Sequence, residues 1–297
     1  MAAKTRKREG SRDGRQTDAG LPRTGIEILN RAISTGGVEV EVSGVRHGFL
    51  SEKGGTVVRA LWDFDLTISA GRFVSIVGPS GCGKTTLLTL IGGLDTARAG
   101  EVKVGGRPVV GPSETVAYML ARDALLPWRT VKRNVEFGME ARGVSAMERA
   151  ERSQEWIQRV GLTGFADWPI GKLSQGMRQR VAIARTLAMS PRCILMDEPF
   201  AALDAQTRSV LQQEFLGLWE REQPTVVLIT HDLTEAILLG DRVVLMSYRP
   251  GRVLVDVEID LPRPRAVEAE LSDPTFAKYY DLLATQLREE VRKGMAN

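Results

Sequence analysis

The spacing of apolar and polar residues changes several times along the chain and predicts where strands and helices lie. Residues 38–42 (VEVEV) alternate with a period of two, and residues 57–68 continue in a strand-like manner, which predicts antiparallel strands early in the fold. Because helix-like segments separate most of the later apolar runs, we expect a mostly parallel sheet with helices on its faces. These runs, typical of buried strands, are 73–78, 193–196, 225–230, 242–247 and 252–259.

The stretch from about 118 to 190 differs from these runs, because it has the spacing of amphipathic helices with charged faces. It predicts a helical lobe inserted into the sheet domain. The expected fold class is therefore α/β: a mostly parallel sheet with an antiparallel N-terminal β-subdomain and the inserted helical lobe. We expect this domain to span residues 37–260.

Both ends of the chain lie outside this predicted domain. Residues 1–36 begin with a cluster of lysines and arginines, which predicts a disordered basic tail, with contact to nucleic acid or lipid headgroups as the alternative. Residues 261–297 predict a proline-broken linker and one amphipathic helix that packs on the chain's own domain. The apolar positions of this helix are Phe276, Tyr280, Leu283, Leu287 and Val291.

Composition places the chain among ordinary soluble globular proteins, with 297 residues, 43% hydrophobic and 26% charged. The net charge of +3 is too small to indicate a nucleic-acid partner, and none is expected. No apolar run approaches the roughly 20 residues of a membrane span, and the N-terminal segment lacks the apolar region of a secretory signal. Two cysteines, Cys82 and Cys193, favour a reducing compartment over a disulfide framework.

The segment GPSGCGKTT has the G-x-x-x-x-G-K-[ST] spacing of a phosphate-binding loop and lies between a predicted buried strand and a helix. Its glycines let successive backbone N–H groups surround phosphates, Lys84 reaches the terminal phosphates, and the Thr85 hydroxyl is a ligand for Mg²⁺. Cys82 is interpreted as a small loop residue, with a thiol activated by the helix dipole as the alternative. The predicted nucleotide-binding residues here are Gly78, Pro79, Ser80, Gly81, Cys82, Gly83, Lys84, Thr85 and Thr86.

Three residues at the ends of other predicted strands complete a site for nucleotide hydrolysis. Asp197 follows the apolar run CILM and is predicted to bind Mg²⁺ through its water shell, while the adjacent Glu198 is the predicted general base. Alone, this acidic pair would be interpreted as a helix cap, but beside a phosphate-binding loop it indicates hydrolysis. His231 ends the run TVVLIT and is predicted to hydrogen-bond the γ-phosphate and orient the attacking water.

A second anion site is predicted at LSQGMRQR, residues 173–180. Ser174 is a favourable N-cap and Gly176 leaves the first turn open, so the following helix would begin with unshielded N–H groups. Such a helix end suits an anion.

All of these motifs, together with AALD at 201–204 and THD at 230–232, stand in the order and spacing that resemble the ATP-binding cassette (ABC) ATPases. The resemblance covers roughly residues 38–260 and implies a P-loop NTPase-type fold that binds ATP and Mg²⁺. It also implies a homodimer in which the signature helix of one cassette caps the γ-phosphate on the phosphate-binding loop of the other.

The implied homodimer explains why the chain has a second predicted anion site. The resemblance implies that Ser174, Gln175 and Gly176 serve the nucleotide of a second subunit, and that Asp204 couples the two sites across the interface. The family usually has glycine where this chain has Gln175, whose side chain could donate to phosphate or point into solvent. Phe49 falls where the family usually has an aromatic residue that stacks on adenine, with His47 as the alternative for that role.

Two further segments, DALLPWRTV at 123–131 and MSYRPGRV at 246–253, look like those of the import ATPases for nitrate, taurine, aliphatic sulfonates and thiamine-precursor pyrimidines. In that group the loop with LLPW lines a groove that receives a short helix of a membrane permease. Internal packing of the same side chains is the alternative, and both can hold at once. The residues concerned are Leu125, Leu126, Pro127 and Trp128.

The resemblance therefore implies the energy-coupling ATPase of an importer, peripheral at the cytoplasmic face of the membrane, with an extracytoplasmic solute-binding protein as an indirect partner. One departure stands out: Ala121 occupies the position where the family has a glutamine that touches Mg²⁺. The alternatives are that Arg122, Asp123 or water substitutes for this glutamine, or that coupling between the permease and hydrolysis is loosened. Our hypothesis is that Mg²⁺ binds through Thr85 and Asp197 with reduced affinity.

Two other classes of protein compete with this interpretation. A soluble cassette ATPase that acts on nucleic acid, ribosomes or cofactor assembly is the alternative, and the basic tail is the feature that favours it. A P-loop kinase or GTPase would have neither a signature helix nor Glu198 after Asp197, and this chain has both.

Overall fold

The computed structural model describes residue 1 and residues 36–50, 55–120, 124–265 and 273–296. The predicted basic tail lies almost wholly outside these residues, as do Ala121 and part of the predicted linker. The division of the chain into a tail, a domain and a C-terminal segment therefore stays a prediction.

A six-stranded sheet forms the centre of the fold, in the order β10-β9-β3-β8-β7-β6. Every neighbouring pair is parallel except β9 and β10, which are antiparallel. Because β3, β7, β8 and β9 run in the same direction, the residues that follow them emerge at one edge of the sheet. The strands are β3 (Phe73–Val77), β6 (Val116–Met119), β7 (Cys193–Asp197), β8 (Thr225–Ile229), β9 (Arg242–Met246) and β10 (Val253–Glu258).

A second, four-stranded sheet in the order β2-β1-β4-β5 is antiparallel and includes the strands that the N-terminal alternation predicts. One face of it packs on α2 (Lys84–Ile91) in a shared core. Near the end of the first strand, Phe49 lies beside the phosphate-binding loop. The strands are β1 (Val40–Leu50), β2 (Val57–Ile68), β4 (Ala99–Val104) and β5 (Arg107–Pro108).

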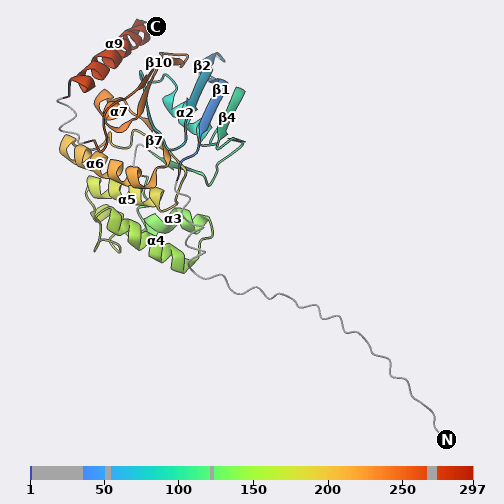
Figure 1. Cartoon of the computed structure of the whole chain (residues 1–297), viewed down its shortest axis with the longest axis vertical. Helices are drawn as coiled ribbons and strands as arrows, with labels where there is room; N and C mark the ends of the chain where they lie inside the picture. The colour runs from blue at the N-terminus through green and yellow to red at the C-terminus, as the bar shows by residue number, and fades with distance from the viewer. Residues whose placement is uncertain (2–35, 51–54, 121–123, 266–272, 297) are drawn as a thin grey trace. The chain divides into compact units, whose positions relative to one another are not determined.

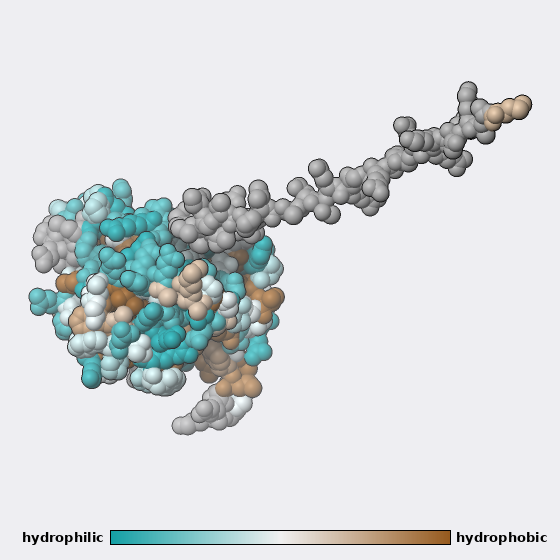
Figure 2. Space-filling model, turned by 90° about the horizontal axis from the view of Figure 1, so that it is seen from below, coloured by the Kyte–Doolittle hydropathy of each residue, from teal (hydrophilic) through white to brown (hydrophobic). Residues whose placement is uncertain are grey.

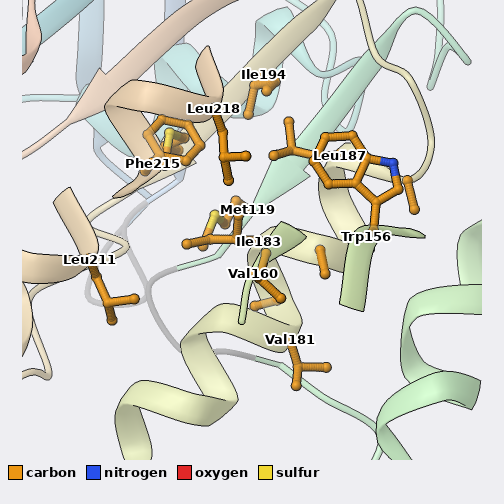
Figure 3. Packing of buried hydrophobic residues seen from close by; sticks show 14 of the residues in the cluster. Met119, Trp156, Val160, Val181, Ile183, Leu187, Ile194, Leu211, Phe215 and Leu218 are labelled. Atoms are coloured by element: carbon orange, nitrogen blue, oxygen red, sulfur yellow. The ribbon is translucent and has the colours of Figure 1, made fainter. Parts of the chain in front are cut away.

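Three helices pack on one another to form the helical lobe: α3 (Val131–Ala141), α4 (Ala146–Arg159) and α5 (Gln175–Leu187). Figure 1 shows them grouped together, with α6 (Ala205–Glu222) alongside α5. A large apolar cluster joins this lobe to α6 and to the central sheet (Figure 3). The side chains shown include Met119, Trp156, Val160, Val181, Ile183, Leu187, Ile194, Leu211, Phe215 and Leu218.

The C-terminal helix α9 (Pro274–Ala296) packs against α7 (Leu233–Leu239), as the sequence predicts for a helix docked on its own domain. Phe276 and Leu283 are buried there. Tyr280, predicted for the same face, is instead 41% exposed, and Tyr279 is the tyrosine that packs, with its hydroxyl accepting a hydrogen bond from the Asp260 amide at 3.0 Å. The prediction for Tyr280 is wrong because the packed stripe passes from Phe276 to Leu283 through Tyr279, three residues after Phe276, rather than through Tyr280, four residues after it.

The surface seen in Figure 2 is mainly hydrophilic, with separate hydrophobic patches. Within the described residues, no helix combines the length and the apolar character that crossing a membrane requires.

Candidate nucleotide-binding and hydrolysis site

The loop between β3 and α2 has the backbone that its glycines allow. Gly81 and Gly83 have φ values of 73° and 109°, in the left-handed region that favours glycine. A Cβ at Gly83 would lie 2.8 Å from the carbonyl oxygen of Ala60, so a side chain at this position would clash with the neighbouring strand. The loop is therefore curled tightly at the start of α2, where backbone N–H groups point toward an anion.

Lys84 is buried at the base of this loop. Its Nζ donates to the carbonyl oxygens of Gly78 and Pro79 at 2.8 and 3.0 Å, so the ammonium group folds back over the loop. Cys82 is fully buried, and this burial raises the pKa of its thiol although Lys84 partly opposes the shift. The alternative of an activated thiol at Cys82 is therefore not supported, and the structure favours the interpretation of a small loop residue.

A hollow of about 450 Å³ opens over the loop. It brings together Lys84, Thr85, Glu198 and His231, which come from three different strand ends. Arg249 also lines it, although no sequence motif predicted a role for this residue. The remaining lining residues are Phe49, Val58, Ala60, Gly78, Ser80, Gly81, Gly83 and Thr86.

Asp197 ends β7 next to the loop, and the hydroxyls of Thr85 and Tyr118 lie close enough to its carboxylate to favour the ionised form. Burial raises the pKa of Asp197 above its ordinary value, although these hydroxyls and the charge of Lys84 act in the opposite direction. Burial, together with the charge of Asp197, also raises the pKa of Tyr118, so this hydroxyl stays a donor. Tyr118 lies on β6, a strand of four residues, and no sequence signal indicated its role.

The pair of Thr85 and Asp197 fits Mg²⁺, because a hydroxyl and a carboxylate supply the hard oxygen ligands that this ion prefers. No group of three or more His, Cys, Asp or Glu side chains that could hold a metal occurs among the residues described. A magnesium ion here would therefore take its other ligands from phosphate and water oxygens, which is its usual coordination in nucleotide sites.

Glu198 turns away from the strand that precedes it. Its φ is 47°, in the region that is costly for a residue with a side chain, while its amide still donates to the Ile229 carbonyl at 2.9 Å. Its carboxylate lies 3.1 Å from Nδ1 of His231. Both side chains are partly exposed at the hollow, at 33% for Glu198 and 66% for His231, so they can reach a water above the phosphates.

The signature segment is also built as expected, at the start of α5. The Ser174 hydroxyl accepts from the Met177 amide at 3.3 Å as an N-cap, and Gln175 accepts from the Arg178 guanidinium at 3.1 Å. The Gln175 side chain is thus turned toward its own helix. A Cβ at Gly176 would lie 2.8 Å from the Thr207 methyl group, so a larger residue would displace this side chain where α5 approaches α6.

Asp204 is the N-cap of α6, and its carboxylate accepts from the Thr207 amide at 3.0 Å. This bond lowers the pKa of Asp204, which keeps the carboxylate ionised. Neither Asp204 nor the three signature residues are among the described residues that line the hollow. Within one chain, Asp204 and the signature residues therefore lie apart from the residues that line the hollow.

Phe49 and His47 differ sharply in exposure at the end of β1. Phe49 is 48% exposed and lines the hollow, whereas His47 is 2% exposed, with Nε2 3.3 Å from an Asp95 carboxylate oxygen. The two rings meet edge to face at 5.0 Å. A buried ring cannot stack on adenine, so the structure favours Phe49 for that role over the His47 alternative.

The loop with LLPW has one residue packed inward and one turned outward. Leu125 belongs to the buried cluster of Figure 3, whereas Trp128 is 77% exposed. Asn134, fully buried on α3, accepts from the Leu126 amide at 2.8 Å and donates to the Leu126, Arg129 and Thr130 carbonyls. Asn134 thus fixes the loop that presents Trp128, and the sequence analysis did not single it out.

Comparison with known proteins shows the family of this chain. The ABC transporter family matches residues 61–201. An uncharacterized ABC transporter ATP-binding protein of Methanocaldococcus jannaschii is 46% identical, covering 82% of this chain and 90% of that protein. The nitrate import ATP-binding protein of Synechocystis is 39% identical, covering 84% and 96%. The taurine import ATP-binding protein of Yersinia pestis is 44% identical, covering 75% and 90%.

Among solved structures, the dimeric post-hydrolysis state of an ATP-binding cassette bound to ADP and Pi aligns with a TM-score of 0.65 at 32% identity. The alignment covers 75% of this chain and all of that one. The chain belongs to the ABC transporter family, as one of its ATP-binding proteins. The predicted fold class, family and ATPase activity are therefore confirmed.

Proposed function

We propose that this chain is the ATP-hydrolysing subunit of an ABC importer and drives solute uptake through a separate permease. The observation that carries the proposal is the hollow in which Lys84, Thr85, Glu198 and His231 meet over the phosphate-binding loop. The relatives named as import ATP-binding proteins support an importer over a soluble cassette that acts on nucleic acid or ribosomes.

Different residues of the hollow bind the phosphates, hold Mg²⁺ and activate the attacking water. Loop N–H groups and Lys84 bind the phosphates, and Thr85 with Asp197 would hold Mg²⁺, which would neutralise charge on the transferred phosphoryl group. Glu198 accepts the proton of the attacking water, and His231 orients that water and the terminal phosphate. The bond between the Glu198 carboxylate and His231 fixes both side chains for this task.

Two copies of the chain form the working unit in this proposal. The signature residues and Asp204 lie apart from the hollow of their own chain, and the related cassette bound to ADP and Pi is a dimer. The N-terminus of α5 would therefore cap the phosphates bound to a second copy, with Ser174, Gln175 and Gly176 facing that nucleotide. Asp204 would couple the two sites.

Trp128 marks the surface that contacts the permease in this proposal, with Pro127 beside it. Location at the cytoplasmic face of the membrane and dependence on an extracytoplasmic solute-binding protein follow from the same proposal. The solute would be a small anion of the nitrate or taurine class.

Replacing Trp128 by alanine is expected to weaken docking to the permease and leave hydrolysis by the isolated chain unchanged. An aromatic anchor contributes about 2 kcal/mol or more to an interface, so we expect roughly thirtyfold weaker association. The measurement is permease-stimulated ATP turnover against permease concentration. Met147→Ala, which truncates another exposed side chain, is the control. Equal stimulation of both variants would remove Trp128 from the interface.

Replacing Ala121 by glutamine is expected to strengthen Mg²⁺ binding, because an amide oxygen is a better ligand than a methyl group. Since Ala121 lies outside the described residues, this prediction rests on the sequence. The Mg²⁺ concentration for half-maximal hydrolysis should fall several-fold, and stimulation by the permease should rise. Val110→Gln, at an exposed position, is the control. Unchanged Mg²⁺ dependence and unchanged stimulation together would end the hypothesis.

The proposed function is tested by deleting this chain in its host and following uptake of labelled taurine, alkanesulfonates, nitrate and a thiamine-precursor pyrimidine. The expected result is loss of uptake of one solute, restored by the wild-type chain and not by Glu198→Gln. Restoration by Glu198→Gln would contradict a role for hydrolysis in uptake.

A further inference from the structure

Arg249 contacts the phosphate-binding loop from the segment after the neighbouring strand β9, at the same edge of the sheet. It lies in the segment between β9 and β10, and β9 is the parallel neighbour of β3, so this segment emerges beside residues 78–83. Its Nε donates to the Gly81 carbonyl oxygen at 2.6 Å. A Cβ at Gly81 would lie 2.6 Å from an Arg249 Nη atom, so the guanidinium group lies directly against the loop.

The segment that carries Arg249 is fixed by hydrogen bonds to the surrounding elements. Gly251 donates to the Ala60 carbonyl at 2.8 Å, which ties the segment to β2. The Tyr248 amide donates to the Glu290 carboxylate at 2.7 Å, which ties it to α9. Glu290 is 3% exposed. The Tyr248 ring packs closely on Gly294 of α9, since a Cβ at Gly294 would lie 2.7 Å from a carbon of that ring. Arg249 is therefore presented by a pre-ordered segment.

The Nη donors of the Arg249 guanidinium are available to bind a ligand. A guanidinium has five N–H donors, and the Gly81 carbonyl takes the Nε donor. Among the described residues, no carboxylate forms an ion pair with Arg249, although the hollow contains Glu198. An exposed, uncompensated guanidinium beside a loop of N–H donors suits a polyphosphate, which guanidinium groups bind through charge-assisted hydrogen bonds.

We propose that Arg249 is a further nucleotide-binding residue of this site, donating from its Nη atoms to a phosphate, and that Glu290 of α9 positions it through Tyr248. The inference deepens the proposed function and rests on it. It gives the C-terminal helix a role at the nucleotide site, since α9 is joined to the phosphate-binding loop by the sequence of contacts Glu290, Tyr248, Arg249 and Gly81.

The test is equilibrium binding of ATP and of ADP to the purified full chain, measured by calorimetry. Arg249→Ala should weaken binding about tenfold, the effect of one charge-assisted hydrogen bond. Arg249→Gln should be equally weak, because glutamine can still donate to the Gly81 carbonyl but has no charge for the phosphate. Arg252→Ala removes an exposed arginine of the same segment outside the hollow and should bind like the wild type. Lys84→Ala reports on the nucleotide site itself.

The outcomes separate this inference from the proposed function. Normal binding by Arg249→Gln with weak binding by Arg249→Ala would make Arg249 a support for the loop alone and overturn the inference. Wild-type binding by both variants, with loss in Lys84→Ala, would also overturn it and leave the proposed function standing. Failure of the wild type to bind ATP would contradict both.

A second pair of variants tests the link to α9. Glu290→Ala should weaken ATP binding in the same direction as Arg249→Ala, although Glu290 is not among the residues that line the hollow. Glu290→Gln keeps an acceptor for the Tyr248 amide and should restore binding. A Glu290→Ala protein that is folded by circular dichroism and binds ATP like the wild type would refute the positioning role.

Discussion

Replacing Glu198 by glutamine is expected to slow ATP hydrolysis by roughly 10²–10⁴-fold, the usual contribution of a general base, and to leave ATP binding intact. The amide has the shape of the carboxylate and cannot accept a proton from water at neutral pH. Its nitrogen or oxygen can still hydrogen-bond His231, which lies 3.1 Å from the carboxylate. The φ of 47° at this position is unaffected by the change, so the backbone turn is retained.

The measurement is the steady-state release of phosphate, together with the dissociation constant for ATP. Glu151→Gln, at an exposed position of α4 and away from the hollow, provides the control and should hydrolyse ATP at the wild-type rate. Hydrolysis by Glu198→Gln at the rate of this control would exclude Glu198 as the base. The neighbouring carboxylate, Asp197, would then have to be reconsidered.

Replacing Arg265 by alanine is expected to lower the free energy of unfolding by about 3 kcal/mol. Arg265 is 2% exposed, and its guanidinium donates to the carbonyls of Ile237, Leu238 and Gly240 at the end of α7. It also donates to the carbonyls of Ile259 and Leu261. Removing it leaves buried carbonyl oxygens without a donor and removes a positive charge from the C-terminus of a helix, both of which are unfavourable.

Unfolding by urea, followed by circular dichroism, measures this loss. Arg252→Ala is the matched control, because Arg252 is exposed and its truncation should change stability by no more than about 0.5 kcal/mol. If the urea-unfolding curves of Arg265→Ala and Arg252→Ala had equal midpoints and slopes, the carbonyls that Arg265 binds would have other donors. Arg265 ends residues 261–265 (LPRPR), whose prolines predicted only a linker.

The sequence predicted the elements that carry strong local signals. The apolar runs became β3, β7, β8, β9 and β10 almost within their expected limits, and the glycine-rich spacing of the phosphate-binding loop was sufficient to place its residues. By contrast, β4, β5 and β6 were not predicted. In β4 only two of the six residues are buried, and β5 and β6 have two and four residues, so none of the three presents a continuous apolar run. The pairing of β6 with β7 depends on tertiary contacts rather than on a pattern of its own.

The same limit explains which site residues were missed. Tyr118 contacts Asp197 only because β6 and β7 are neighbours in the sheet, and Arg249 contacts Gly81 only because β9 lies beside β3. Asn134 and Arg265 act through backbone carbonyls, which any sequence offers everywhere. Their partners become evident only when the strand order and the ends of the helices are known.

If two copies of this chain together form each hydrolytic site, as we propose, mixing two inactive variants should restore ATP hydrolysis. Glu198→Gln disables the base. Ser174→Asp keeps a favourable N-cap on α5 but places a negative charge where the partner's phosphates would bind.

In a mixed dimer, one site has both defects and the other has neither. We expect the mixture to hydrolyse ATP well above the rate of either variant alone. A mixture that stays as inactive as its components would contradict a site shared between two chains.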